Sequence, residues 1–168
     1  MHPTEKAFEE VYVASKDRLM TLATALTGDA SAAEDVVHDV FAALVEDPWR
    51  LDTNPNLTPH LVVCVRNRAL DRIRSNKRRE TRETVHMELG PGPGSSDPGE
   101  QVAEDDQRET LLNLVKRLPK HLREVLSLRV WGELTFEEIA KLQGIVKSTA
   151  HERYCDALDQ LRMKLAGG

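Results

Sequence analysis

The segment at residues 90–99 constrains the fold more than any other, because its prolines and glycines follow one another too closely for regular structure. It reads Gly-Pro-Gly-Pro-Gly-Ser-Ser-Asp-Pro-Gly. Proline removes a backbone donor and glycine adds backbone freedom, so neither a helix nor a central strand persists through such a run. The sequence therefore predicts two domains, residues 1–86 and 106–168, joined by a flexible acidic linker over residues 87–105.

Both halves of this 168-residue chain carry apolar residues at the three- and four-residue spacing of amphipathic helices. Neither half shows the strict alternation that is typical of strands. The first helix is expected to end at Thr27-Gly28, and local signals mark where later helices begin. These expected starts are Ser31 with Glu34, Thr58 with Pro59, Pro119, Thr135 with Glu138, and a point near Ser148. We therefore expect an all-α fold.

The second half has the order helix, glycine-containing turn, helix that is typical of a helix-turn-helix. Thr135 opens a short helix, Gly144 interrupts the pattern, and the last helix follows. Ala140 supplies a small side chain where the two helices would cross. Any helical hairpin produces the same spacing, so the pattern alone leaves both interpretations open.

Charge is strongly segregated along the chain, although the net charge is only −5. Residues 66–82 contain eight basic and two acidic side chains, whereas the segments on either side are acidic. Local potential, rather than total charge, decides where a phosphate group binds. The basic block therefore indicates a polyanionic partner for an otherwise acidic protein.

Composition argues against several other classes of protein. No apolar run approaches the ~20 residues of a membrane helix, and the first residues lack the apolar core of a signal peptide. Cys64 and Cys155 stand far apart, without metal spacing or a disulfide framework, which favours the reducing cytoplasm. The six histidines show no metal-ligand spacing, and no phosphate loop or nucleophile elbow occurs. We expect neither catalysis nor a cofactor.

Three stretches stand in a fixed order along the chain. Residues 33–41 read Ala-Glu-Asp-Val-Val-His-Asp-Val-Phe, and residues 61–74 read Leu-Val-Val-Cys-Val-Arg-Asn-Arg-Ala-Leu-Asp-Arg-Ile-Arg, with Lys77-Arg78-Arg79 after them. Residues 118–153 begin with Leu-Pro and contain Glu-Ile-Ala and Gly-Ile. Together they resemble the sigma-70 family of bacterial transcription initiation factors, in particular its short extracytoplasmic-function group. The resemblance implies, in order, a segment that docks on the polymerase clamp, a segment that melts and reads the minus-ten promoter element, and a helix-turn-helix that reads the minus-thirty-five element.

The resemblance assigns roles to individual residues of the first domain. Asn67 has an amide able to read a base edge, and neighbouring cations can hold the phosphate backbone. The expected minus-ten set is Arg66, Asn67, Arg68, Arg72, Arg74, Lys77, Arg78 and Arg79. On the preceding helix, Asp35, His38 and Asp39 share one face and are expected to contact the clamp of core RNA polymerase. Without the resemblance, all of these residues also suit an ordinary solvated helix surface.

The last helix is expected, again from the resemblance, to read duplex DNA. The minus-thirty-five set is Lys147, Ser148, Thr149, His151 and Arg153. Glu152 and Asp156 depart from the family pattern, and added carboxylates oppose binding to a phosphate backbone. We therefore expect recognition of the minus-thirty-five element that is weak or directed at an unusual sequence.

These features together predict a cytoplasmic sigma factor that binds core RNA polymerase and promoter DNA and is controlled by an anti-sigma factor or another regulator. Neither an enzyme nor insertion into a membrane is expected. Two alternatives stay open. One is a sigma-like decoy that binds polymerase or an anti-sigma factor without reading a promoter, which His60, Glu152 and Asp156 favour as departures from the family pattern. The other is a small helical hydrolase that uses histidines and carboxylates.

Overall fold

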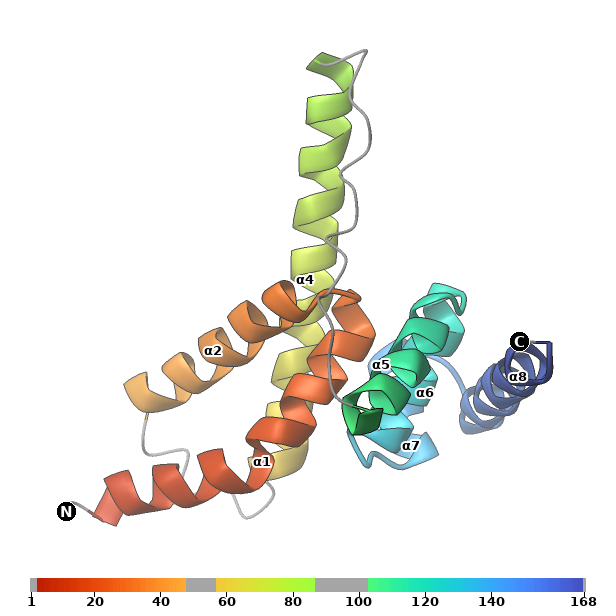
Figure 1. Cartoon of the computed structure of the whole chain (residues 1–168). Helices are drawn as coiled ribbons and strands as arrows, with labels where there is room; N and C mark the ends of the chain where they lie inside the picture. Colours follow the sequence, from red (N-terminus) through yellow and green to blue (C-terminus); the bar gives the residue numbers. More distant parts are fainter. Residues whose placement is uncertain (1–2, 48–56, 87–102, 168) are drawn as a thin grey trace.

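Seven α-helices make up the described part of the chain, which in this computed structural model comprises residues 3–47, 57–86 and 103–167. The first half contains α1 (Pro3–Thr27), α2 (Ala30–Glu46) and α4 (Leu57–His86). The second half contains α5 (Ala103–Lys116), α6 (Lys120–Val130), α7 (Phe136–Gln143) and α8 (Lys147–Ala166). No strand occurs within these three ranges, and the expected all-α class is confirmed (Figure 1).

The predicted linker over residues 87–105 lies outside the described residues as far as residue 102. The helix α5 begins at Ala103. The expected domain boundary at residue 106 therefore falls inside the first turn of this helix rather than before it.

Local sequence signals set most of the helix ends. Gly28 and Gly144 follow α1 and α7 with φ angles of +76° and +67°, a left-handed conformation that favours glycine. The hydroxyl oxygen of Thr135 accepts a hydrogen bond from the backbone N–H of Glu138 at 3.2 Å, which is the expected cap of α7. Pro119 precedes the first residue of α6, as predicted.

Two expected helix starts are wrong by one or two residues. The cap of α2 is Asp29, whose Oδ1 accepts from the backbone N–H of Ser31 at 3.1 Å. Ser31 therefore lies inside the helix, because the aspartate two residues earlier satisfies the free amide first. The helix α4 already includes Leu57, so Thr58 belongs to its first turn and is not its cap.

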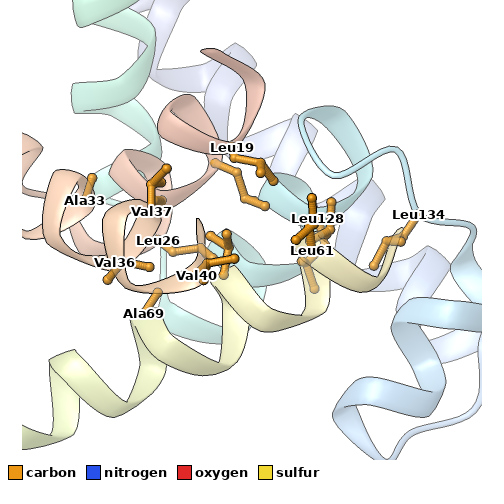
Figure 2. Close-up of a cluster of buried hydrophobic side chains, with 14 of the residues drawn as sticks. Leu19, Leu26, Ala33, Val36, Val37, Val40, Leu61, Ala69, Leu128 and Leu134 are labelled. Atoms are coloured by element: carbon orange, nitrogen blue, oxygen red, sulfur yellow. The ribbon is translucent and has the colours of Figure 1, made fainter. Parts of the chain in front are cut away.

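The helices α1, α2 and α4 pack around an apolar core. Figure 2 shows side chains from all three helices meeting between their ribbons. The buried set includes Leu19, Leu22 and Leu26 of α1, Val36, Val37, Val40 and Phe41 of α2, and Leu61, Val65 and Ala69 of α4. Each helix contributes one apolar face to this core. The three- and four-residue spacing of apolar residues in the first half is therefore the spacing of the side chains that are buried.

The same apolar core continues into the second half of the chain. Leu128 of α6 and Leu134, which follows α6, belong to the buried cluster that contains Leu61 (Figure 2). Gly132 lies so close to α4 that an added Cβ would stand 2.9 Å from Cγ1 of Val62. The two predicted domains are therefore packed directly against each other.

A second cluster strengthens this packing. Ala25 of α1 is fully buried together with Val115, Leu118, Leu122 and Leu126 from α5, the turn after it, and α6. Its small side chain lets α1 approach the second half closely. One helix of the first half thus contributes to the cores of both halves.

The helix α4 is far longer than its packing requires. It has 30 residues, and every described side chain from Arg74 to Glu83 is exposed. Figure 1 shows this second half of α4 projecting away from the other helices. The basic turns of α4 therefore face water. Despite this length, none of the described helices combines the extent and apolarity needed to cross a bilayer.

Replacing Leu128 with alanine is expected to lower the free energy of unfolding by about 2–5 kcal/mol, because it opens a cavity at a fully buried site. The matched control is Leu165→Ala in the last turn of α8, where the side chain is 60% exposed, and its effect should stay within about 0.5 kcal/mol. Urea unfolding followed by circular dichroism measures both. Equal effects would contradict the described core.

Candidate nucleic-acid interface

The predicted minus-ten set lies entirely on α4 and divides by position along the helix into three groups. Arg66 and Asn67 come first, where the helix still packs against the rest of the molecule. Arg68 and Arg72 lie beside α2. The remaining members, Arg74, Lys77, Arg78 and Arg79, all lie on the projecting half and are exposed.

Among the ion pairs between described residues, the one that Arg66 forms is the least exposed of the minus-ten set. Its Nε lies 2.6 Å from Oε1 of Glu124 on α6, and the side chains of Arg66 and Glu124 are only 16% and 10% exposed. Arg66 also donates from Nη1 to the amide oxygen of Asn67 at 3.1 Å. The amide of Asn67, which is predicted to read a base edge, is thus exposed but already accepts one hydrogen bond.

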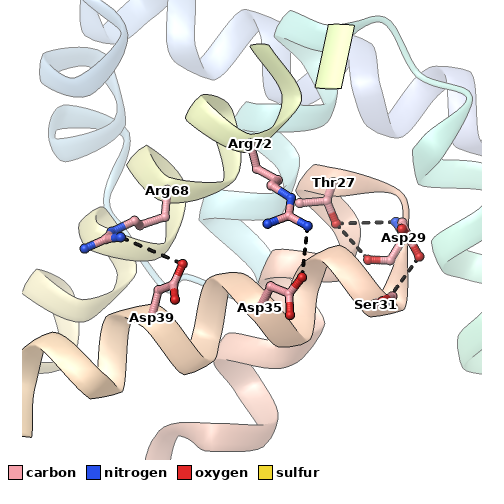
Figure 3. A network of polar contacts seen from close by, with 7 residues as sticks. All are labelled: Thr27, Asp29, Ser31, Asp35, Asp39, Arg68 and Arg72. Carbon is pink, nitrogen blue, oxygen red and sulfur yellow. Dashed lines mark hydrogen bonds and ion pairs between the residues drawn. The ribbon is translucent and has the colours of Figure 1, made fainter. Parts of the chain in front are cut away.

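The second group brings two predicted sites together. Arg72 lies 2.9 Å from Asp35, and Arg68 lies 3.8 Å from Asp39 (Figure 3). All four side chains are between 43% and 54% exposed. Exposed pairs of this kind contribute little to stability. Arginines assigned to DNA and carboxylates assigned to polymerase therefore neutralise each other only weakly, and each can exchange its partner.

His38 lies on the same helix as these two carboxylates and is exposed, whereas Val36, Val37 and Val40 are buried. The three residues expected to face polymerase therefore share the solvent side of α2.

The projecting half of α4 carries the densest positive charge. Arg79 pairs with Glu83 at 3.3 Å and Arg74 lies 3.9 Å from Asp71, both within the helix and both exposed. Lys77 and Arg78 are exposed on the same turns. Because these turns touch no other described helix, a strand of nucleic acid can approach them from several directions.

The predicted minus-thirty-five set lies in the first two turns of α8. Lys147, Ser148 and His151 are exposed, while Thr149 and Arg153 are half-buried. No side chain caps the helix at Val146. The backbone N–H groups of Lys147 and Ser148 can therefore meet a phosphate group, as is usual at a helix N-terminus. The N–H of Thr149 instead donates to the carbonyl of Val146 at 3.1 Å.

Two members of this set also contact the preceding helix of the helix-turn-helix. Arg153 donates from Nη1 to Oε1 of Gln143 at 3.1 Å. The ring of His151 meets the ring of Phe136 edge-on, with centroids 5.1 Å apart. Glu152 is exposed beside them, so the carboxylate that departs from the family pattern does face the solvent side of the helix.

A cleft of about 330 Å³ joins the two predicted DNA-binding sets. Arg66 of α4 and Arg153 of α8 both line it, together with Lys120, His121, Glu124, Leu142 and Gln143. The structure therefore brings one member of each set to the same cleft between the two halves.

Arg123 is a second cation close to Glu124. Its guanidinium is half-buried, and the lost hydration lowers its pKa, while the charge of Glu124 acts in the opposite direction. The guanidinium also donates to the backbone carbonyl of Lys116 at 3.3 Å. Because arginine starts far above neutral pH, the group stays cationic.

Sequence reasoning missed the residues that join the two halves through charge. Glu124 stands four residues before the fully buried Leu128 and so shares its face of α6, a signal that could have indicated a buried carboxylate. Arg18 of α1 lies 3.0 Å from Glu133 in the turn after α6. No local pattern identifies that second pair, because its residues are 115 positions apart.

Two models of one protein family match the chain. Sigma-70 region 2 matches residues 11–79, and Sigma-70, region 4 matches residues 108–161. The first range contains α2 and α4 as far as Arg79. The second contains α6 and α7 and most of α8. Both predicted DNA-binding sets therefore fall within matched regions.

Individual proteins are similar over nearly the whole chain. Probable RNA polymerase sigma factor RfaY from Xanthomonas campestris pv. campestris is 25% identical over 166 residues, which cover 96% of this chain and 41% of RfaY. ECF RNA polymerase sigma factor SigK from Mycobacterium bovis is 24% identical over 159 residues, which cover 94% of this chain and 85% of SigK. The chain thus spans about two fifths of RfaY and most of SigK.

One solved structure has the same fold. It is the sigma factor RpoE in complex with the anti-sigma factor NepR from Bartonella quintana, with a TM-score of 0.70 and 19% sequence identity. The similarity covers 96% of this chain and 98% of that one.

Replacing Arg78 and Arg79 together with alanine is expected to weaken binding to single-stranded DNA and to flatten its salt dependence. Each lost phosphate contact should reduce the slope of log K against log salt by about 0.7. The measurement is fluorescence anisotropy across a salt series. Lys164→Ala at the end of α8 is the control with a distant positive charge. An unchanged slope in the double variant would count against the projecting half of α4 as the DNA surface.

Proposed function

Because this chain belongs to the sigma-70 family of RNA polymerase sigma factors, in its extracytoplasmic-function group, we propose that it binds core RNA polymerase and directs promoter-specific initiation of transcription. The observation that carries the proposal is the presence of both family regions in order, each with its basic or helix-turn-helix surface exposed. The members of this family regulate transcription. We propose no catalytic activity for this chain and place it in the cytoplasm, where polymerase acts.

Docking on polymerase uses the solvent side of α2. Asp35, His38 and Asp39 are exposed there, on a helix whose opposite side is held in the core. A basic surface on the polymerase clamp can compete for the two carboxylates, because their pairs with Arg72 and Arg68 are half-exposed and weak. Released arginines on α4 are then available to phosphate groups of the promoter.

Opening of the promoter uses α4 as a single straight element. Asn67 reads the edge of an exposed base, and Arg68, Arg72, Arg74, Lys77, Arg78 and Arg79 hold the backbone of the separated strand. Arg66 joins this set once it leaves Glu124. All of these cations lie on the one helix α4, so they can contact one continuous stretch of backbone.

Binding of the minus-thirty-five element uses the start of α8. Lys147 and Ser148 bring their backbone N–H groups to the phosphates and Thr149 brings its hydroxyl, while His151 and Arg153 reach toward base edges. Glu152 and Asp156 restrict this reading to sequences that offer amino donors, such as cytosine. The helix-turn-helix therefore serves as a second, sequence-selective binding site for the promoter.

Transcription in vitro tests the proposal directly. Core RNA polymerase and genomic DNA of the source organism are incubated with and without the purified chain, and transcript starts are mapped by sequencing. We expect start sites that depend on the chain and share a common upstream sequence. Binding to polymerase without such transcripts would indicate a decoy, and no binding at all would overturn the proposal.

The double variant Asp35→Asn, Asp39→Asn is expected to bind core polymerase about tenfold more weakly, which is ~1.4 kcal/mol. It removes two negative charges that face a basic partner while keeping the side-chain size. Thermal unfolding should change little, because the two intramolecular pairs are exposed. The control is Glu46→Gln, which removes a charge from the exposed end of α2. Interferometry with immobilised polymerase measures all three proteins, and equal affinities would place the docking surface elsewhere.

A further inference from the structure

We propose that the cleft lined by residues of α4, α6, α7 and α8 binds a small anion that carries a phosphate or diphosphate group. The cleft has a volume of about 330 Å³, at the lower end of the range for sites that bind small molecules. A ligand of that size is inorganic phosphate or diphosphate, or the phosphate end of a nucleotide. Binding in the cleft does not depend on the proposed function, whereas its effect on promoter binding rests on that function.

Positive charge is in excess in this cleft. The cations that line it are Arg66 of α4, Lys120 of α6 and Arg153 of α8, and Glu124 is the one carboxylate among the described residues of the lining. A cleft lined mainly by one sign of charge concentrates the electric field and attracts ions of the opposite sign. The excess is two positive charges. A phosphate group balances it, because such a group carries about −1.5 to −2 at pH 7, whereas a chloride ion or a single carboxylate balances only half.

Protein contacts hold the two arginines in place. Nε of Arg66 lies 2.6 Å from Oε1 of Glu124, and its Nη1 donates to the amide oxygen of Asn67 at 3.1 Å. Nη1 of Arg153 donates to Oε1 of Gln143 at 3.1 Å. A guanidinium has five N–H donors in a planar fork that matches phosphate oxygens, which is more donors than these contacts use. Because both groups are already oriented, binding an anion costs less side-chain entropy than it would at mobile surface residues.

Burial strengthens the attraction of the cleft for an anion. The side chains of Arg66 and Glu124 are only 16% and 10% exposed, and Gln143 and Arg153 are half-buried. Lys120, in the first turn of α6, is exposed. Water and salt screen a contact with the half-buried groups less than they screen a contact with a surface patch. The exposed lysine attracts the anion from solution, and the half-buried arginines provide the hydrogen bonds.

Glu124 determines which cations an anion neutralises. Its carboxylate alone repels an anion, but Arg66 compensates that charge at 2.6 Å. The positive charges left to a ligand are therefore those of Lys120 and Arg153, which come from α6 and α8. Both cations must contribute if the anion lies in the cleft.

A bound anion competes with DNA for two of the predicted contacts. Arg66 belongs to the predicted minus-ten set and Arg153 to the predicted minus-thirty-five set, and both line the cleft. An anion that binds both guanidinium groups occupies donors that would otherwise meet phosphate groups of the promoter. The competition is for the same N–H groups and requires no rearrangement of the helices. A phosphate-bearing metabolite therefore lowers promoter binding.

Isothermal titration calorimetry of the full-length chain tests the binding. The probes are inorganic phosphate, pyrophosphate and ADP, without divalent cations and with the ionic strength held constant by sodium chloride. We expect one anion per chain, and pyrophosphate should bind more tightly than phosphate because it carries more charge. Tighter binding of ADP than of pyrophosphate would identify a nucleotide as the ligand, and the reverse order would identify the inorganic ion. Absence of saturable binding by all three would overturn the proposal.

Two variants locate the site. Lys120→Glu and Arg153→Gln change the cations on α6 and α8, and each should weaken pyrophosphate binding about tenfold. The matched control is Lys6→Glu, which makes the same change as Lys120→Glu at an exposed site near the start of α1 and should bind like the wild type. Because Lys120 is exposed, its variant keeps the test valid even if Arg153→Gln fails to fold. A folded cleft variant that binds as tightly as Lys6→Glu would overturn the cleft as the site.

Binding of DNA tests the competition. The DNA is a fluorescent, random-sequence single-stranded oligonucleotide, and its anisotropy is measured without polymerase. Pyrophosphate at ten times its Kd should weaken binding by up to about tenfold at constant ionic strength, and less so in Lys120→Glu. Equal affinity with and without pyrophosphate would overturn the competition. The calorimetry does not depend on transcription, so failure of the proposed function is detected separately, as a lack of chain-dependent transcripts.

Discussion

The buried first half of α4 is the constraint on which the remaining structure depends. Leu61, Val62 and Val65 are almost completely buried, between α1 and α2 on one side and the residues after α6 on the other. Interiors pack as densely as organic crystals, so a helix with neighbours on both sides cannot shift without disturbing them. Apolar contacts, and not charge pairs, therefore set the position of the basic surface.

Burial decides what each ion pair along α4 can do. Arg68 and Arg72 meet the carboxylates of α2 at half-exposed positions, where water screens the attraction and exchange of partners has a small energetic cost. Arg66 meets Glu124 where little water reaches, so that pair is costly to separate unless another charge replaces one member. A single helix thus carries contacts that exchange readily and one that resists exchange.

Much of the local structure was predictable from residue patterns. The cap at Thr135 and the break at Gly144 both depend on neighbours a few positions away, which a linear pattern records. The predicted cap at Ser31 was wrong, although it too was read from neighbouring residues. Asp29 and Ser31 offer similar oxygen acceptors, and a pattern does not decide which one reaches the free amide first.

Residue order alone was sufficient for the helical class, the two matched regions and the identity of the cations on α4 and α8, because these follow from periodicity and side-chain chemistry. Three-dimensional packing settled whether the halves touch, which cations are already paired, and that Glu124 is buried. These facts depend on contacts between residues that are far apart in the sequence. Arg66 and Glu124 are separated by 58 positions, and Arg18 and Glu133 by 115. Such contacts form only when the two halves of the chain pack against each other, and no short-range sequence pattern predicts that packing.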